Sequence, residues 1–311
     1  MKTKPIILPL LILSLPCLLL SQSIIEKYNH LGEIFIPELK SAPFPHPARA
    51  NGHVYQEKTY SCQEHYSDSS VAIFIPGALQ KTSKTNIVVY FHGWNNNIAK
   101  ACNKFHLIEQ FSASDINAIF IFPEGPKNSP DSHGGKMEDK NGLKNLIDEV
   151  LLYLTKKGKL ESTNVGDIIL AGHSGAYRAI SFCLMHGGLT NNITDVILFD
   201  ALYGNTEKYV QWIRNYNGRF INIYTDNGGT KEETENLMKD FDSQGIAYFK
   251  TVEKDLKQTD LTENRLIFIH TDLTHSEVIS VRNQLQKYLL TSSVGTNKSK
   301  STKSQRVKEK I

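Results

Sequence analysis

Residues 167–185 impose the strongest constraint on the fold of this chain. The apolar run Asp167–Ala171 has the composition of a buried strand, and it leads directly into Gly172-His173-Ser174-Gly175-Ala176. An apolar helical run begins at Tyr177. Small residues around a serine permit a turn that is too tight for larger side chains, with the serine in a strained conformation at the end of the strand. The sequence therefore predicts a strand, a sharp turn that presents Ser174, and a helix.

Short apolar runs alternate with helical periodicity along much of the chain. Strands are predicted at Val71–Ile75, Ile87–Phe91, Ala118–Phe122, Asp167–Ala171, Val196–Phe199, Phe220–Tyr224 and Leu266–Ile269. Helices are predicted at Leu143–Thr155, Glu233–Phe241 and Glu277–Leu290. This alternation is typical of an α/β protein in which helices cover both faces of a mostly parallel central sheet.

The turn around Ser174 resembles the nucleophile elbow of the α/β-hydrolase family. The usual pattern of that elbow is G-x-S-x-G, and this chain has the small residue Ala176 in place of the second glycine. The resemblance spans most of residues 70–290. It implies an α/β-hydrolase fold with a mostly parallel central sheet, and it implies that Ser174 is the nucleophile of a serine hydrolase.

The same resemblance implies an oxyanion loop after an early strand. At that place the chain has His92-Gly93-Trp94. Acyl transfer needs two preorganised N–H donors for the developing negative charge. We expect the backbone amides of Trp94 and Gly175 to be these donors, with His92 and Gly93 shaping the loop. The alternative interpretation is that His92-Gly93 only ends a strand.

Two histidines near the end of the predicted sheet compete for the role of general base. His270 belongs to the last strand, whereas His275 lies on the loop after it, where the family histidine usually sits. We predict that His275 takes the proton of Ser174 and returns it to the leaving group. His173, beside the nucleophile, is expected to shape the elbow.

The acidic member of the triad has two candidates. Asp200 follows the strand Val196–Phe199, and Asp226 follows the strand Phe220–Tyr224. Most family members use the later position, which favours Asp226. Local chemistry favours Asp200, because a carboxylate at the tip of an apolar strand is costly unless a partner such as an imidazolium compensates it. We choose Asp200, keep Asp226 as the alternative acid, and expect Glu124 to line the pocket.

Charge and composition divide the chain into four parts. Residues 1–23 have a basic start, an uncharged apolar run and small residues, which predicts a cleaved signal peptide and no stable membrane span afterwards. An uncleaved membrane anchor is the alternative, but the apolar run of about 16 residues is short for a spanning helix. Residues 24–69 are expected to be an irregular lead-in, residues 70–290 the catalytic domain, and residues 291–311 a basic disordered tail. The net charge of +3 comes from the two ends, so the acidic body argues against nucleic-acid binding.

Three cysteines follow the predicted signal peptide. An oxidising compartment allows one pair, for which Cys62 and Cys102 are the better choice, while Cys183 lies in an apolar helical run and is expected to be buried. The spacing of histidines and cysteines supports no metal site.

The sequence as a whole predicts a secreted or periplasmic serine hydrolase that acts without a metal or organic cofactor. A carboxylic ester, either a small molecule or a polymer of the cell envelope, is the expected substrate. An amidase or peptidase of the same fold is the alternative, and so is a binding protein that has kept the fold without catalysis.

Overall fold

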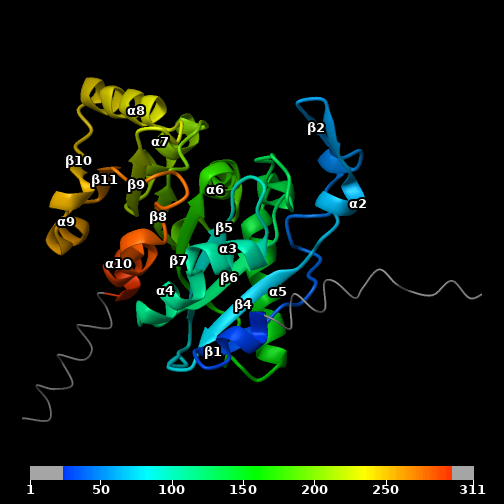
Figure 1. Ribbon diagram of the computed structural model, residues 1–311. Helices are drawn as coiled ribbons and strands as arrows, with labels where there is room; N and C mark the ends of the chain where they lie inside the picture. Colours follow the sequence, from blue (N-terminus) through cyan, green and yellow to red (C-terminus); the bar gives the residue numbers. More distant parts are fainter. Residues whose placement is uncertain (1–23, 296–311) are drawn as a thin grey trace, which may run out of the picture.

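The computed structural model describes residues 24–295 (Figure 1). Within that range, nine strands form the central sheet. In sheet order they are β1 (Gly32–Phe35), β4 (Val71–Pro76), β6 (Ile119–Pro123), β5 (Thr85–Phe91), β7 (Val165–His173), β8 (Ile193–Phe199), β9 (Arg219–Thr225), β11 (Leu266–Thr271) and β10 (Phe249–Val252). The predicted mostly parallel central sheet is thus confirmed.

Strand direction brings several loops to one edge of this sheet. Every pair from β6 through β5, β7, β8, β9, β11 and β10 is parallel, whereas β4 runs antiparallel to both of its neighbours. Because parallel strands end at the same edge, the loops that follow β5, β7, β8 and β11 lie together there. Ligands of open α/β sheets bind outside this carboxyl edge.

Helices cover both faces of the sheet, as its apolar strands require. On one face the apolar side chains of α5 (Gly142–Lys156), α6 (Tyr177–His186), α7 (Thr206–Asn215) and α8 (Lys231–Gln244) form one core with the strands. On the other face α3 (Ile98–Phe105), α4 (Leu107–Ala113), α9 (Gln258–Glu263) and α10 (Gln284–Leu290) contribute to the second core. Figure 1 shows α4 and α10 side by side.

All seven predicted strands are present, and the predicted helices at 143–155 and 233–241 fall within α5 and α8. The prediction of one helix over Glu277–Leu290 is wrong in its first half, because α10 begins only at Gln284. Arg282 and Asn283 have φ of 66° and 51°, which no α-helix accommodates. The side chain of Arg282 is instead bound to Glu253 and Asp272.

The lead-in of residues 24–69 is more regular than predicted. It supplies the edge strand β1, the hairpin of β2 (His53–Tyr55) and β3 (Lys58–Tyr60), and the short helix α2 (Cys62–His65). The hairpin stands out from the body in Figure 1. Its Tyr55 packs edge-on against Trp94, with ring centroids 5.2 Å apart. The lead-in therefore reaches the carboxyl edge of the sheet.

The two predicted end segments fall largely outside the described residues. The predicted signal peptide of residues 1–23 lies outside them, as does most of the predicted tail. The first five residues of that tail are described, and Thr291, Ser292 and Val294 are buried there. No helix within residues 24–295 is both long enough and apolar enough to cross a membrane.

Candidate active site

Ser174 occupies the turn between β7 and α6. Its φ of 57° lies in the left-handed region, which a residue with a side chain rarely adopts. The turn requires small neighbours. A methyl group on Gly172 would lie 2.6 Å from the Cβ atom of Ala176. Glycine at position 172 therefore leaves room for the alanine that replaces the usual second glycine, and the strained elbow forms despite the incomplete motif.

His275 lies on the loop that follows β11 and lines the same cavity as Ser174. Its Nδ1 atom is 2.7 Å from Oδ2 of Asp200. Asp200 comes directly after β8 and is fully buried, whereas His275 is partly exposed. This arrangement holds Nδ1 toward the carboxylate and leaves Nε2 as the other nitrogen available to a substrate.

Three hydrogen bonds from neighbouring threonines also hold the carboxylate of Asp200. The Thr225 hydroxyl donates to Oδ2 at 2.8 Å and its backbone N–H donates to Oδ1 at 3.3 Å, while the Thr230 hydroxyl also donates to Oδ1. Burial raises the pKa of Asp200, but the bonds from His275, Thr230 and Thr225 outweigh it and hold the pKa below its ordinary value. Sequence reasoning did not find either threonine.

Asp226, the alternative acid, lies beside the other histidine. Its Oδ1 atom is 3.0 Å from Nε2 of His270 and 2.6 Å from Nζ of Lys231. Its side chain is half exposed, and the bonds from Lys231 and His270 lower its pKa. Of the two Asp–His pairs formed by the candidate acids, only Asp200–His275 has a member in the wall of the cavity of Ser174, namely His275.

His173 supports the loop of His275. Its Nε2–H donates to the carbonyl oxygen of His275 at 2.8 Å, and the two rings lie 4.4 Å apart between centroids. Burial, together with the neighbouring His275, lowers the pKa of His173 to about 3. The ring is therefore neutral near neutral pH, with its single proton on the nitrogen that faces the carbonyl.

The loop after β5 lies directly against the elbow. A methyl group on Gly93 would be 2.5 Å from the Cβ atom of Ser174 and 3.0 Å from the backbone nitrogen of Gly175. The indole N–H of Trp94 donates to the hydroxyl of Ser132 at 2.7 Å. The Gly93-Trp94 segment is therefore held beside the backbone amide of Gly175.

A buried histidine and carboxylate hold this loop from behind. His92 contacts the Gly93 carbonyl through Nδ1 at 2.7 Å and Oε1 of Glu124 through Nε2 at 2.9 Å. The backbone N–H of Ile98 donates to Oε2 of Glu124 at 3.2 Å, which ties the start of α3 to the same group. The prediction that Glu124 lines the pocket is wrong, because this carboxylate is used inside the protein to anchor the loop.

The cavity in front of Ser174 has a volume of about 470 Å³. Its wall combines aromatic rings with polar groups. The aromatic residues are Trp94, Phe105, Tyr177 and Tyr203, and the polar ones include Asn95, Asn96, Lys104, Ser132 and Ser276. A volume of this size suits a small organic molecule.

No protein-family model matches the chain, and no curated protein matches it either. Many solved structures do. The feruloyl esterase module of Clostridium thermocellum, solved with sinapinate, superposes with a TM-score of 0.53 at 13% identity, over 84% of this chain and 88% of that one.

Fluorophosphonate-binding serine hydrolase F of Staphylococcus aureus superposes with a TM-score of 0.50 at 9% identity, over 82% of this chain and 95% of that one. Both chains are matched over most of their length. The chain has an α/β-hydrolase fold. At these identities the likeness concerns the fold alone.

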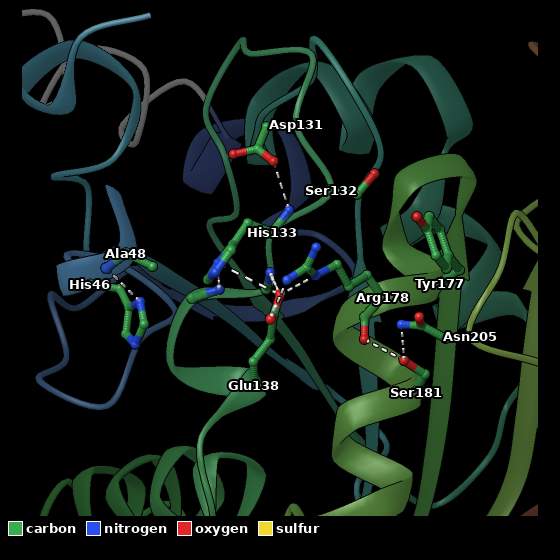
Figure 2. Close-up of polar contacts among 12 residues, drawn as sticks. His46, Ala48, Asp131, Ser132, His133, Glu138, Tyr177, Arg178, Ser181 and Asn205 are labelled. Atoms are coloured by element: carbon green, nitrogen blue, oxygen red, sulfur yellow. Dashed lines mark hydrogen bonds and ion pairs between the residues drawn. The ribbon is translucent and has the colours of Figure 1, made fainter. Parts of the chain in front are cut away.

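One wall of the cavity of this α/β-hydrolase fold belongs to the loop that carries Ser132. Glu138 receives two bonds from Arg178 of α6, both 2.7 Å long, and one from the backbone of Gly134 at 2.6 Å. The backbone N–H of His133 donates to Asp131 at 3.0 Å. Figure 2 shows the contact of His133 with Asp131 and the contacts of Arg178 with Glu138. The loop is thus fixed to α6, the helix that follows the elbow.

The lead-in is attached to the same loop. The guanidinium of Arg49 donates two bonds to Asp131, at 2.6 and 3.0 Å. Asp131 is nine-tenths buried, and although burial raises its pKa, the bonds from Arg49 and His133 hold that pKa below its ordinary value. The contact secures the segment that leads to Tyr55, which packs on Trp94 at the edge of the cavity.

The predicted disulfide between Cys62 and Cys102 is absent. All three described cysteines are free thiols. Cys102 faces the core from α3, whereas Cys62 begins α2 in the partly exposed lead-in. Cys183 is buried in α6 as predicted, and burial raises the pKa of its thiol. Within residues 24–295, no group of three or more His, Cys, Asp or Glu residues is arranged to hold a metal ion.

A larger groove of about 710 Å³ lies at the opposite, amino edge of the sheet. Arg219 and Arg265 are its cationic residues. Arg219 is bound to Asp195 and to carbonyls of the C-terminal segment, and Arg265 is bound to the carbonyls of Ile213 and Tyr216. Both guanidinium groups therefore hold neighbouring loops together, and we assign them a structural role in this groove.

Proposed function

We propose that this protein is a serine hydrolase that cleaves carboxylic esters, with Ser174 as nucleophile, His275 as general base and Asp200 as the residue that orients the base. One observation carries the proposal: the strained serine opens into a cavity whose wall includes a histidine bound to a fully buried aspartate. The fold, which is also that of known esterases, is compatible with this chemistry.

The first half of the reaction forms an acyl-enzyme. Oγ of Ser174 bonds to the ester carbonyl carbon while Nε2 of His275 takes the hydroxyl proton, and the carbonyl oxygen becomes an oxyanion. Asp200 stabilises the imidazolium that results. The tetrahedral intermediate then collapses, the bond to the alcohol oxygen breaks, and His275 returns its proton to the departing alcohol.

The second half regenerates the enzyme. Water replaces the alcohol, His275 takes a proton from it, and the hydroxide oxygen bonds to the acyl carbon. Collapse of the second intermediate releases the carboxylic acid, and the proton returns to Oγ of Ser174. Both intermediates carry an oxyanion, for which the amides of Trp94 and Gly175 are the proposed donors. Loss of one such donor costs about 3 to 4 kcal/mol of barrier.

A small ester with an aromatic part fits the wall of the cavity best. The rings of Trp94, Phe105, Tyr177 and Tyr203 offer flat apolar surfaces, and aromatic pairs add about 0.5 to 1.5 kcal/mol beyond the buried area. The feruloyl esterase module with a similar fold acts on an aromatic ester by its name. Hydrolysis of an amide or peptide bond is the second candidate, which the assay below separates.

The proposal includes export of the chain. The basic start and uncharged apolar run of residues 1–23 support it. Expression of the full chain in a bacterium, followed by fractionation and sequencing of the mature N-terminus, tests this part. A start near Ser23 or Ile24 in an extracytoplasmic fraction is expected, and an uncleaved chain in the membrane fraction would contradict it.

Hydrolysis of para-nitrophenyl acetate and butyrate, beside para-nitroacetanilide, tests the proposed reaction. We expect turnover of the esters, and we expect Ser174→Ala to abolish it and to prevent labelling by a fluorophosphonate. Ser243→Ala is the matched control, because Ser243 is an exposed serine of α8 that is not part of the cavity wall, and we expect this variant to keep the label. Full activity of a folded Ser174→Ala variant refutes the mechanism, and faster cleavage of the anilide than of the esters favours an amidase.

A further inference from the structure

Within residues 24–295, the wall of the cavity in front of Ser174 carries a positive charge and no negative one. Among the described residues that line it, Lys104 is the only one with a permanent charge, and none is an aspartate or glutamate. Two carboxylates lie nearby, but both are buried behind the wall. Asp200 is fully buried against His275, and Glu124 is buried against His92. A ligand in the cavity thus meets one full positive charge.

Lys104 lies in the last turn of α3 and is exposed. Its Nζ atom is 3.3 Å from the hydroxyl of Ser276 and 5.2 Å from the ring centroid of Phe105. Within residues 24–295 it forms no ion pair with a carboxylate. Lys27 differs from it, because its ammonium group lies 3.3 Å from Glu109. The ammonium group of Lys104 is therefore not neutralised by an acid of the protein.

The position of Lys104 identifies which part of a substrate it would meet. Its partner Ser276 is the residue next to His275, and His275 must reach the oxygen of the departing alcohol to protonate it. The alcohol part of an ester therefore lies nearest to His275, Ser276 and Lys104. The acyl carbon lies instead at Ser174, beside the loop of Gly93 and Trp94.

We propose that the natural substrate carries an anionic group, a carboxylate or a phosphate, on its alcohol part, and that Lys104 selects for it. This inference rests on the proposed ester hydrolysis and specifies the substrate class for it. An ammonium group with free donors attracts a carboxylate or phosphate by charge and by hydrogen bonds. The attraction is strongest at low ionic strength, because Lys104 is exposed to solvent.

A pair of matched esters tests the inference. Para-acetoxybenzoate and para-acetoxybenzamide share the acetyl group and the phenol ring, and they differ in the charge of the para substituent. The measured quantity is the ratio of their kcat/KM values at low salt. We expect this ratio to fall about fivefold or more in Lys104→Met and further in Lys104→Glu. We also expect high salt to lower the ratio of the parent protein.

Two control variants separate charge from structure. Lys100→Met removes an exposed lysine of the same helix, which is bound to Asn128 and is not part of the cavity wall, so it should leave the ratio as it is. Lys104→Arg changes the side chain but keeps its positive charge, so it should also preserve most of the ratio.

The outcomes distinguish the inference from the proposed function. An equal fall for both esters in Lys104→Met, with no further change of the ratio in Lys104→Glu, means that Lys104 only holds the loop of His275 and overturns the inference. A second pair of esters carries the charge on the acyl part: the para-nitrophenyl monoester of adipic acid and the same ester with its free carboxylate converted to an amide. If substitution of Lys104 changes the kcat/KM ratio of this second pair and not that of the first, the anion belongs on the acyl part and the inference is overturned. Failure of Ser174 to hydrolyse even para-acetoxybenzamide is instead a failure of the proposed function.

Discussion

Replacement of Asp200 by asparagine removes one negative charge with little change of shape. In the proposed mechanism His275 becomes an imidazolium, and the carboxylate 2.7 Å away stabilises it. At an effective dielectric constant of about 20, the attraction between unit charges at this distance is about 6 kcal/mol. Each 1.36 kcal/mol of barrier is a factor of ten in rate, so we expect kcat to fall about ten-thousandfold in Asp200→Asn.

Asp226→Asn is the matched control for this experiment. Asp226 also contacts a histidine, at 3.0 Å from His270, but this pair is exposed and does not border the cavity of Ser174. We expect less than about a twofold change of kcat, in line with the small energies of exposed ion pairs. Both variants are measured on para-nitrophenyl acetate after their folding is checked by circular dichroism. A severe loss in Asp226→Asn with activity retained in Asp200→Asn would refute the assignment of the acid.

Three further predictions concern Gly93, His173 and the described cysteines. Gly93→Ala places a methyl group 2.5 Å from the Cβ atom of Ser174, so we expect kcat/KM to fall about a hundredfold. Gly77→Ala is the control, because its methyl group would meet only a carbonyl oxygen at 3.7 Å, and it should be as active as the parent. The pKa of His173 is about 3 in the folded protein and 6.5 in its ordinary state, so between these values the unfolded chain binds a proton that the folded protein does not. The free energy of unfolding, measured by urea titration, should therefore fall by on the order of 4 kcal/mol from this group as the pH is lowered from 6.5 to 3. The fall should be shallower in His173→Gln. Alkylation of the native protein followed by peptide mapping should modify Cys62 and spare the two buried described cysteines, and a mapped disulfide would contradict the structure.

The fold could be predicted from the sequence because its central strands are buried on both faces. Such strands appear as continuous apolar runs, as in Ile87–Phe91 and Val196–Phe199, and all seven predicted strands of this kind are present. The edge strands β1 and β10 were missed. Each has only four residues and is partly exposed, so neither leaves a continuous apolar run.

The candidate site could be predicted where its residues follow strands. Ser174 and Asp200 come directly after β7 and β8, and the glycines beside the elbow are visible in the sequence. The supporting groups could not be predicted in the same way. Thr225 and Thr230 act on Asp200 from the next loop, and nothing in their spacing sets them apart from ordinary threonines of a strand end and a helix start.

The direction of the Glu124 side chain could not be predicted from the sequence. Its position after a buried strand correctly indicates the carboxyl edge of the sheet, but position alone does not say whether a side chain points into the cavity or behind it. Its bond to His92, 32 residues earlier in the chain, decides that question, and only the folded structure contains this contact.

The order of strands in the sheet has a consequence for how the protein acquires activity during synthesis. Ser174 follows β7 and Asp200 follows β8, but His275 comes only after β11, which must first pair with β9. A growing chain that has passed the elbow thus carries a serine without a base. Under the proposed mechanism this serine cannot attack an ester until β11 and the loop of His275 have been made and have folded. Recovery of esterase activity after refolding therefore reports that β11 has paired with β9 and that the loop of His275 has taken its place.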